Sequence, residues 1–224
     1  MTFIQIQGST PQQQDPLVFL PGWGFDGRVA RYWAWPPALE VLAPASFCHA
    51  GLVEGLRASL AGRRVARVAL VGWSMGANLA WQFATTYPEM VASVTLLGGR
   101  SHWPAPEIAA IKAALAADLP KTMRDFYRKC FLGQKGLYQD FAGGLQEEYL
   151  ARLNRQELED GLDYLASSPL VGQAPEECMV RVVHGRKDVI APFEERPRIG
   201  GAKEQVVDAA GHLLFSHSPS SLLR

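Results

Sequence analysis

The sequence predicts an α/β fold, in which a mostly parallel, doubly wound sheet carries a helical cap inserted after the strand at residues 94–97. Two observations lead to this prediction. Short apolar runs alternate with helical patterns along the chain, as they do where helices cover both faces of a parallel sheet. The alternation stops between about residues 100 and 175, where one helical pattern follows another. A chain of 224 residues is long enough for one sizeable core, so we expect a single domain, residues 1–224, with the cap at residues 100–175.

The expected strands are short, mostly apolar segments bounded by turn residues. They lie at residues 3–7, 17–20, 39–42, 65–71, 94–97, 179–183 and 205–207. Helices are expected at residues 50–60 and 75–87. Pro88 ends the second helix, because proline cannot continue one.

Apolar side chains spaced three and four residues apart predict helices within the cap. They form three stripes, which are Ile108, Ile111, Leu115 and Leu119; Met123, Phe126, Tyr127, Cys130 and Phe131; and Leu158, Leu162 and Leu165. The glycine-rich segment at residues 133–144 is expected to turn between two of these helices.

The balance of charge argues against nucleic acid or an anionic membrane as a partner. The chain has 22 basic and 22 acidic side chains, so no overall field attracts a polyanion. No segment reaches the roughly 18 apolar residues of a membrane span, and the first residues lack a signal-like apolar run, so we expect a cytoplasmic protein. Cys48, Cys130 and Cys178 are odd in number and lack a C-x-x-C pattern, which favours reduced, buried thiols over a disulfide or a metal site.

A pentapeptide of the form G-x-S-x-G lies between an expected strand and an expected helix. It reads Gly72-Trp73-Ser74-Met75-Gly76. In a strand–turn–helix elbow the serine is held in a strained conformation, and the positions two before and two after it crowd together, so glycine is needed at both. An ordinary glycine turn is the alternative, but the position at a strand–helix junction favours the elbow. We therefore predict Ser74 as a catalytic nucleophile.

An activated serine needs a histidine as general base and a carboxylate that orients the histidine. In folds with this elbow the chain order is serine, acid, histidine, each on a loop at the carboxyl end of a strand. Asp188 follows the strand at residues 179–183 and His212 follows the last strand, so we predict these two residues. The alternatives are His217, which lies beyond the expected loop, and Asp208, which is better suited to capping the turn before His212.

Two backbone N–H groups are expected to bind the oxyanion that forms when Ser74 attacks an acyl carbon. One belongs to Met75, the residue after the nucleophile, and the other to Trp23 in the loop Pro21-Gly22-Trp23-Gly24-Phe25. The glycines of this loop let the backbone approach a ligand closely. A plain glycine-rich turn is the alternative.

Five segments in this order carry a family resemblance. They are Leu20-Pro21-Gly22-Trp23-Gly24, the elbow at residues 72–76, Asp160-Gly161-Leu162-Asp163-Tyr164-Leu165, the turn at residues 185–188, and Gly211-His212 with Ser216-His217-Ser218-Pro219. The chain resembles the biotin-pathway esterases, which hydrolyse the methyl ester of pimeloyl-[acyl-carrier-protein] methyl ester. The resemblance runs nearly end to end and implies an α/β-hydrolase fold, with the catalytic roles on Ser74, Asp188 and His212. Two departures concern the near wall of the pocket: Pro21 replaces a frequent histidine, and residues 43–47 replace a longer Asp-x-Pro-Gly-x-Gly-x-Ser segment.

The resemblance also implies an acyl-carrier protein as partner. Lys121, Arg124 and Arg128 share one helix face and would steer an acidic carrier toward the pocket, with a solvated helix face as the alternative. The expected walls of an acyl pocket are aromatic, with core packing as the alternative. These residues are Trp23, Phe25, Trp73 and Phe126.

The predicted reaction is hydrolysis through an acyl-Ser74 intermediate, without a metal or a cofactor, and with pimeloyl-[acyl-carrier-protein] methyl ester as substrate. A broad-specificity short-chain carboxylesterase or thioesterase is one alternative. A catalytically silent binding module on the same fold is an alternative from another class, because a fold alone does not imply a function.

Overall fold

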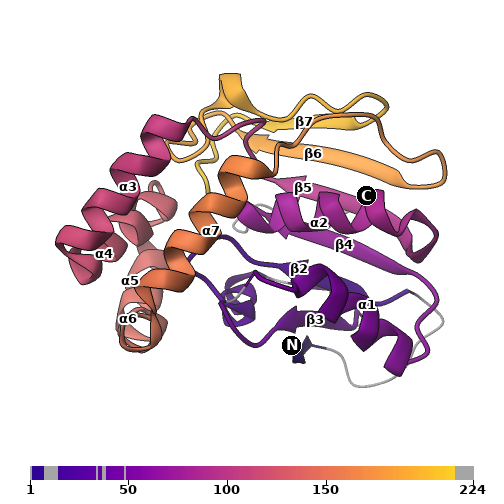
Figure 1. Ribbon diagram of the computed structural model, residues 1–224, viewed down its shortest axis with the longest axis horizontal. Coiled ribbons are helices and arrows are strands. Elements are labelled where there is room, and N and C mark those ends of the chain that lie inside the picture. Colours follow the sequence, from indigo (N-terminus) through magenta and orange to yellow (C-terminus); the bar gives the residue numbers. More distant parts are fainter. Residues whose placement is uncertain (1, 8–14, 34, 37–38, 48, 215–224) are drawn as a thin grey trace.

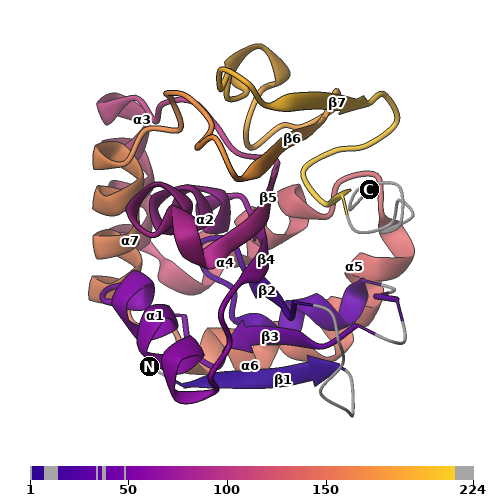
Figure 2. The same cartoon turned by 90° about the vertical axis from the view of Figure 1, so that its right-hand side faces the viewer.

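A computed structural model describes residues 2–7, 15–33, 35–36, 39–47 and 49–214. Within them, seven strands form one sheet in the order β1-β3-β2-β4-β5-β6-β7. The strands are β1 (Phe3–Gln7), β2 (Leu17–Leu20), β3 (Val41–Pro44), β4 (Val68–Trp73), β5 (Val91–Leu97), β6 (Met179–Gly185) and β7 (Lys203–Val207). Only β1 runs antiparallel to its neighbour; the other pairs are parallel, which confirms the predicted fold class. Figure 2 shows β1 and β7 at the two edges of the sheet.

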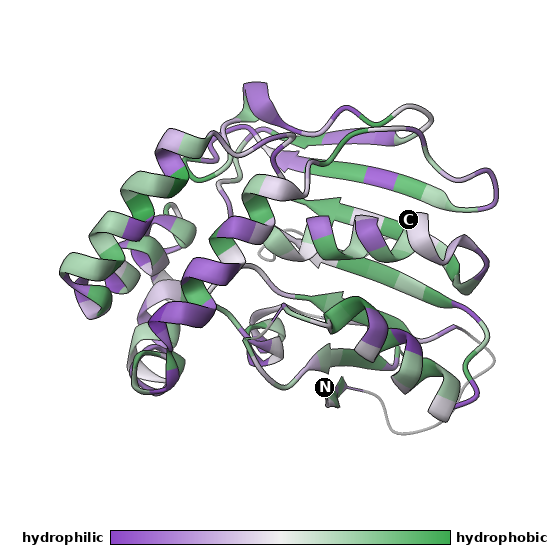
Figure 3. Ribbon diagram, viewed as in Figure 1, coloured by the Kyte–Doolittle hydropathy of each residue, from purple (hydrophilic) through white to green (hydrophobic). Residues whose placement is uncertain are grey.

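The central strands are buried because they consist almost entirely of apolar residues. All four residues of β2 are buried, and five of the six in β4. Figure 3 shows these strands as hydrophobic along most of their length. Helices α1 (Leu52–Gly62) and α2 (Met75–Thr86) lie together on one face of the sheet (Figures 1 and 2). The strand expected at residues 39–42 lies two residues later, as β3.

Five helices lie between β5 and β6 in the chain, and Figure 1 shows them on the side where the central strands end. They are α3 (Ala105–Ala117), α4 (Leu119–Cys130), α5 (Lys135–Gly143), α6 (Leu145–Arg152) and α7 (Arg155–Ser167). The expectation of a turn at residues 133–144 is wrong, since α5 occupies most of that segment. Its glycines meet nothing that would reject a helix, and Leu137 and Phe141 supply a single apolar face that packs on the core.

The cap is joined to the sheet domain by an aromatic cluster centred on Phe25. The Phe25 ring lies 4.9 Å from that of Trp73, 5.0 Å from Tyr127 of α4, 5.9 Å from Phe141 of α5 and 6.1 Å from Tyr149 of α6. These spacings are those of tilted and edge-on aromatic pairs, which add to the burial of apolar area. One side chain from the loop after β2 therefore contacts three cap helices.

Three short 3-10 helices complete the described structure: η1 (Gly27–Tyr32), η2 (Pro88–Met90) and η3 (Phe193–Glu195). No helix in the described part of the chain is long and apolar enough to span a bilayer. Cys130 and Cys178 are buried free thiols, as expected, whereas Cys48 lies outside the described residues.

Candidate active site

Ser74 lies at the sharp turn between β4 and α2. Its φ of 56° and ψ of −121° fall in a region that L-residues rarely adopt. A Cβ atom added to Gly72 would lie 2.2 Å from the carbonyl oxygen of Gly76, and one added to Gly76 would lie 2.0 Å from that of Leu20. Only glycine fits at both positions, so the pentapeptide forms the strained elbow that its pattern predicts.

Asp188 and His212 meet beside this elbow, on the loops that follow β6 and β7. His212 Nδ1 lies 2.8 Å from Asp188 Oδ2, and the backbone carbonyl of His212 accepts a hydrogen bond of 2.9 Å from Trp73 Nε1. His212 Nε2 is buried and has no hydrogen-bond partner among the described residues. With Nδ1 held by the carboxylate, Nε2 is the ring nitrogen left to exchange a proton.

The Asp188 carboxylate is fixed on its other oxygen as well. Oδ1 accepts hydrogen bonds of 2.8 Å from the backbone N–H groups of Ile190 and Ala191. Burial acts to raise the pKa of Asp188, but the charge and hydrogen bond of His212 and the bond from Ala191 outweigh it, and the pKa is lowered. Asp188 is therefore ionised at neutral pH and can balance an imidazolium.

The structure also separates Asp188 from its alternative, Asp208. Asp208 is exposed and accepts a hydrogen bond of 2.6 Å from Arg186, on the surface. The other alternative, His217, lies outside the described residues, as do residues 216–219 of the family motif.

A second buried histidine, His184, supports the loop that holds Asp188. Its Nε2 lies 2.8 Å from the carbonyl oxygen of Ala191 and 3.7 Å from Asp188 Oδ2. Burial lowers the pKa of His184, so the ring is neutral and donates from Nε2 to that carbonyl. The sequence gives His184 no catalytic role, because it lies where its expected strand is ending and a lone histidine is usually structural or solvated; β6 extends to include it. The only local signal is its position directly before the glycine of the Asp188 turn.

The loop at residues 22–26 lies against the elbow and is called the oxyanion loop below, after the predicted Trp23 donor. A Cβ atom added to Gly22 would lie 3.1 Å from Ser74 Cβ, so the backbone passes very close to the predicted nucleophile. Among the described residues, the backbone N–H groups of Trp23 and Met75 donate none of the hydrogen bonds found in turns and loops. Both are available to a ligand next to Ser74.

A cavity of about 500 Å³ opens at Ser74 and extends under the cap. This volume lies within the roughly 300 to 1,000 Å³ typical of small-molecule sites. Its lining is mostly apolar and comes from α3, α4, α7 and the Asp188 loop: Trp23, Ser74, Trp103, Glu107, Ala110, Ile111, Ala114, Thr122, Asp125, Phe126, Lys129, Leu162, Leu165, Val189 and Ile190.

Two of the four aromatic side chains expected as pocket walls, Trp23 and Phe126, line this cavity. The other two, Phe25 and Trp73, do not: both are almost completely buried and pack against each other in the core. Phe25 points into the cap, where it packs against α4 and α5. Trp73 is the last residue of β4, and its indole N–H donates a hydrogen bond to the His212 carbonyl. For these two residues core packing replaces the expected wall.

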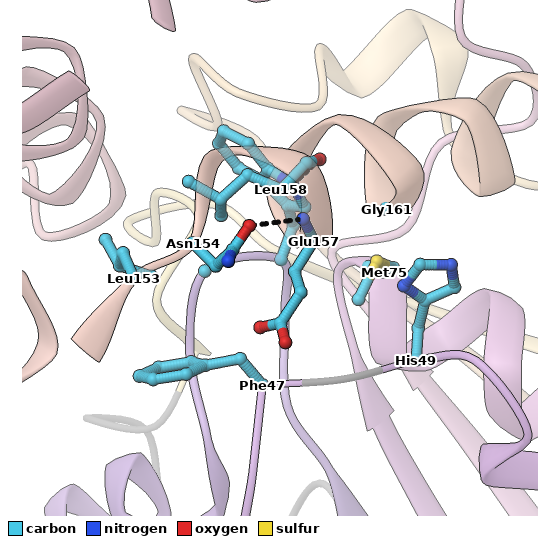
Figure 4. A pocket seen from close by; sticks show the side chains of 10 residues that line it. Phe47, His49, Met75, Leu153, Asn154, Glu157, Leu158 and Gly161 are labelled. Carbon is cyan, nitrogen blue, oxygen red and sulfur yellow. Dashed lines mark hydrogen bonds between the residues drawn. The ribbon is translucent and has the colours of Figure 1, made fainter.

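A second pocket shares Trp23 and Met75 with the site but not Ser74 (Figure 4). Figure 4 shows Phe47 and His49 on one side of it and the start of α7, with Asn154 and Glu157, on the other. Its volume of about 10 Å³ is at the lower limit for one water molecule. It is too small for an acyl group, so the larger cavity is the candidate substrate site.

The predicted basic face of α4 is partly neutralised. Arg124 forms an ion pair of 3.1 Å with Glu147 of α6, and Arg128 one of 3.1 Å with Asp125. Lys121 is exposed and has no ion pair among the described residues, and Lys129 of the same helix lies at the cavity. Sequence spacing could not reveal the pairing with Glu147, because that residue lies in another helix.

A strained serine elbow beside an Asp–His pair is the arrangement of a serine hydrolase, and the similarity of the chain to known proteins agrees with this class. Residues 17–223 match the alpha/beta hydrolase family, and the chain belongs to it. It is 28% identical to the pimeloyl-[acyl-carrier protein] methyl ester esterase of Aeromonas hydrophila, over 94% of this chain and 93% of that protein. It is also 28% identical to a putative carbamate hydrolase, RutD, of Klebsiella pneumoniae, over 81% of this chain and 62% of that protein.

A solved esterase structure from Exiguobacterium antarcticum supports the fold independently. It superposes with a TM-score of 0.73 over 95% of this chain and 88% of that one, at 16% identity. These findings confirm the resemblance predicted from the sequence and the alpha/beta hydrolase fold.

Proposed function

We propose that the protein is a serine carboxylesterase that hydrolyses pimeloyl-[acyl-carrier-protein] methyl ester in the synthesis of a biotin precursor. The observation that carries the chemistry is the hydrogen bond of 2.8 Å between His212 Nδ1 and Asp188 Oδ2, beside the strained elbow of Ser74. It leaves Nε2 as the proton acceptor for a serine hydroxyl.

In the proposed mechanism His212 Nε2 takes the proton of Ser74 while Oγ attacks the ester carbonyl carbon. The carbonyl oxygen becomes an oxyanion, which accepts hydrogen bonds from the N–H groups of Trp23 and Met75. When the bond from the carbonyl carbon to the methoxy oxygen breaks, His212 gives its proton to that oxygen, which leaves as methanol. Water then attacks the acyl-serine carbon, with His212 as base, and releases the acid and free Ser74.

The choice of substrate rests on the cavity and on the relatives. A mostly apolar cavity of about 500 Å³, walled by Trp23 and Phe126, suits the methylene chain of an acyl group. Lys121 and Lys129 offer positive charge on α4 to an acidic carrier, whereas Arg124 and Arg128 are already paired. Such exposed charges act mainly on the rate of association. The proposal includes a cytoplasmic location, shared with the carrier.

The decisive experiment measures hydrolysis of pimeloyl-[acyl-carrier-protein] methyl ester by the purified protein, with free methyl pimelate and the Ser74→Ala variant alongside. We expect turnover that is lost in the variant and weaker on the free ester. Brisk cleavage of simple short-chain esters or thioesters without turnover of the carrier-bound ester would instead identify a broad-specificity enzyme. Failure of a fluorophosphonate to label Ser74 would identify a silent binding module.

The carrier contact has its own test. Lys121→Glu should raise KM for the carrier-bound ester and leave KM for the free ester unchanged. Lys203→Glu on the edge strand β7, remote from α4, is the matched control for a change of two charges. Equal effects of the two variants would exclude α4 as the carrier surface.

A further inference from the structure

Three cap helices form buried hydrogen bonds with the oxyanion loop. From α4, Tyr127 Oη donates to the carbonyl oxygen of Gly24 at 2.8 Å. From α6, Tyr149 Oη donates to Asp26 Oδ1 at 2.8 Å. On α7, the carbonyl oxygen of Leu158 accepts from Trp23 Nε1 at 2.8 Å. The loop is thus anchored by the cap along most of its length.

The cap also packs against this loop without spare room. Gly24 has a φ of 73°, and a Cβ atom there would lie 2.6 Å from Met123 Cε of α4. A Cβ atom on Gly161 of α7 would lie 2.8 Å from Trp23 Cδ1. The positive φ of Gly24 favours glycine, and a Cβ atom at Gly161 would force the Trp23 indole to shift, so α7 confines the loop sterically as well as by a hydrogen bond.

Anchors matter for the oxyanion loop because the glycines on either side of Trp23 give its backbone conformational freedom. Trp23 stands between two glycines, which have more conformational freedom than other residues, and within the loop the Phe25 N–H forms a hydrogen bond of 3.1 Å with the Gly22 carbonyl. Transition-state stabilisation by an N–H group depends on its being aimed in advance at the developing charge. Holding the Gly24 carbonyl restrains the backbone next to Trp23, and with it the peptide group that carries the Trp23 N–H.

We propose that Tyr127 is a positioning residue of the oxyanion hole: its hydrogen bond to the Gly24 carbonyl keeps the Trp23 N–H aimed at the acyl oxygen bound at Ser74. This inference rests on the proposed hydrolase function. The cap thereby contributes to the rate of the chemical step as well as to substrate binding.

The properties of Tyr127 fit this role. The side chain is completely buried, and burial raises the pKa of its hydroxyl far above the ordinary value, so it is a neutral donor at neutral pH. Its ring packs against Phe25 and Phe141 at 5.0 and 5.1 Å. A Tyr127→Phe substitution keeps these ring contacts and removes only the hydroxyl.

The test compares Tyr127→Phe with Tyr164→Phe in the hydrolysis of p-nitrophenyl butyrate. Tyr164 also joins the cap to the sheet domain through its hydroxyl, which lies 2.9 Å from Gln82 Oε1 on α2. Among the described residues, no hydrogen bond or ring contact joins it to the oxyanion loop. We expect Tyr127→Phe to lower kcat about 10-fold with little change in KM, the effect of one buried hydrogen bond felt in the transition state. Tyr164→Phe should leave both constants within about twofold.

A second readout separates positioning from general loosening of the structure. A trifluoromethyl ketone forms a tetrahedral adduct whose oxygen occupies the oxyanion hole, so its affinity should fall by the same factor as kcat. The pH profile of kcat should keep its shape, because the Asp188–His212 pair is untouched. Tyr149→Phe, which removes a second anchor, is measured alongside in case Tyr127→Phe does not fold.

Equal kcat values for wild type and Tyr127→Phe, or an equal loss in Tyr164→Phe, would overturn the inference while leaving the proposed function intact. A wild-type protein that neither cleaves esters nor reacts with a fluorophosphonate at Ser74 would overturn both.

Discussion

Replacing Gly161 by alanine tests how tightly the cap holds Trp23. Alanine favours a helix by about 1 kcal/mol over glycine, so α7 itself gains stability. The added methyl, however, would lie 2.8 Å from Trp23 Cδ1 and 3.2 Å from Nε1, where ordinary contact begins at 3.4 Å. Overpacking of this kind typically costs about 1 to 3 kcal/mol. The free energy of unfolding should therefore fall by roughly 0 to 2 kcal/mol.

Gly136→Ala in α5 is the matched control, since a Cβ atom there meets nothing within 4 Å. It should raise the free energy of unfolding by up to about 1 kcal/mol, so that the two variants differ by about 1 to 3 kcal/mol in urea denaturation. Because the indole must yield, Gly161→Ala should also lower kcat for p-nitrophenyl acetate roughly 10- to 100-fold, whereas the control keeps full activity. If the two variants are equally stable and equally active, the argument from close approach is wrong.

Three further predictions concern the site. Asp188→Asn should lower kcat roughly 10⁴-fold at neutral pH, because the amide no longer orients and balances the imidazole, and steady-state kinetics on any cleaved ester measures this. The pKa of His184 is lowered in the folded protein, so below a pH of about 6.5 the unfolded chain binds a proton at His184 that the folded protein does not. The free energy of unfolding of the wild type therefore decreases as the pH is lowered. Urea unfolding between pH 7 and 5 should show a smaller slope in His184→Gln, and an equal slope would contradict the assignment of a buried neutral ring. Ile111→Trp should narrow the cavity, lowering kcat/KM for an eight-carbon ester at least about 10-fold relative to the acetate; unchanged chain-length preference would place the acyl group elsewhere.

The sequence predicts a feature of the site when a short motif, or the order of strands and loops, determines that feature. The crowding that requires Gly72 arises within five residues, against the carbonyl of Gly76, whereas Gly76 is crowded by the carbonyl of Leu20 at the end of β2. The elbow could be predicted from its pattern and its place between a strand and a helix. Asp188 and His212 could be chosen because parallel strands bring the loops at their carboxyl ends to one edge of the sheet.

The remaining features depend on contacts between distant parts of the chain. Whether Phe25 faces a cavity or the core is decided by the cap helices that surround it. Arg124 has the spacing of a free basic face, but its partner Glu147 belongs to a helix that spacing on α4 cannot reveal. The segment at residues 133–144 is mostly helical despite its glycine content, because the tertiary core selects the apolar pair Leu137 and Phe141 as a helix face.

The placement of Phe25 limits how this protein can be recombined with its relatives. The cap occupies one continuous stretch of chain between β5 and β6, which suggests that it can be exchanged as a cassette. The side chain that anchors it, however, is Phe25 in the loop after β2, far from the cap in sequence, and three of the five cap helices pack around the Phe25 ring. A chimera that imports a foreign cap must also import the matching loop at residues 22–26, since otherwise the new helices would meet a ring and a set of hydrogen-bonding groups built for other partners.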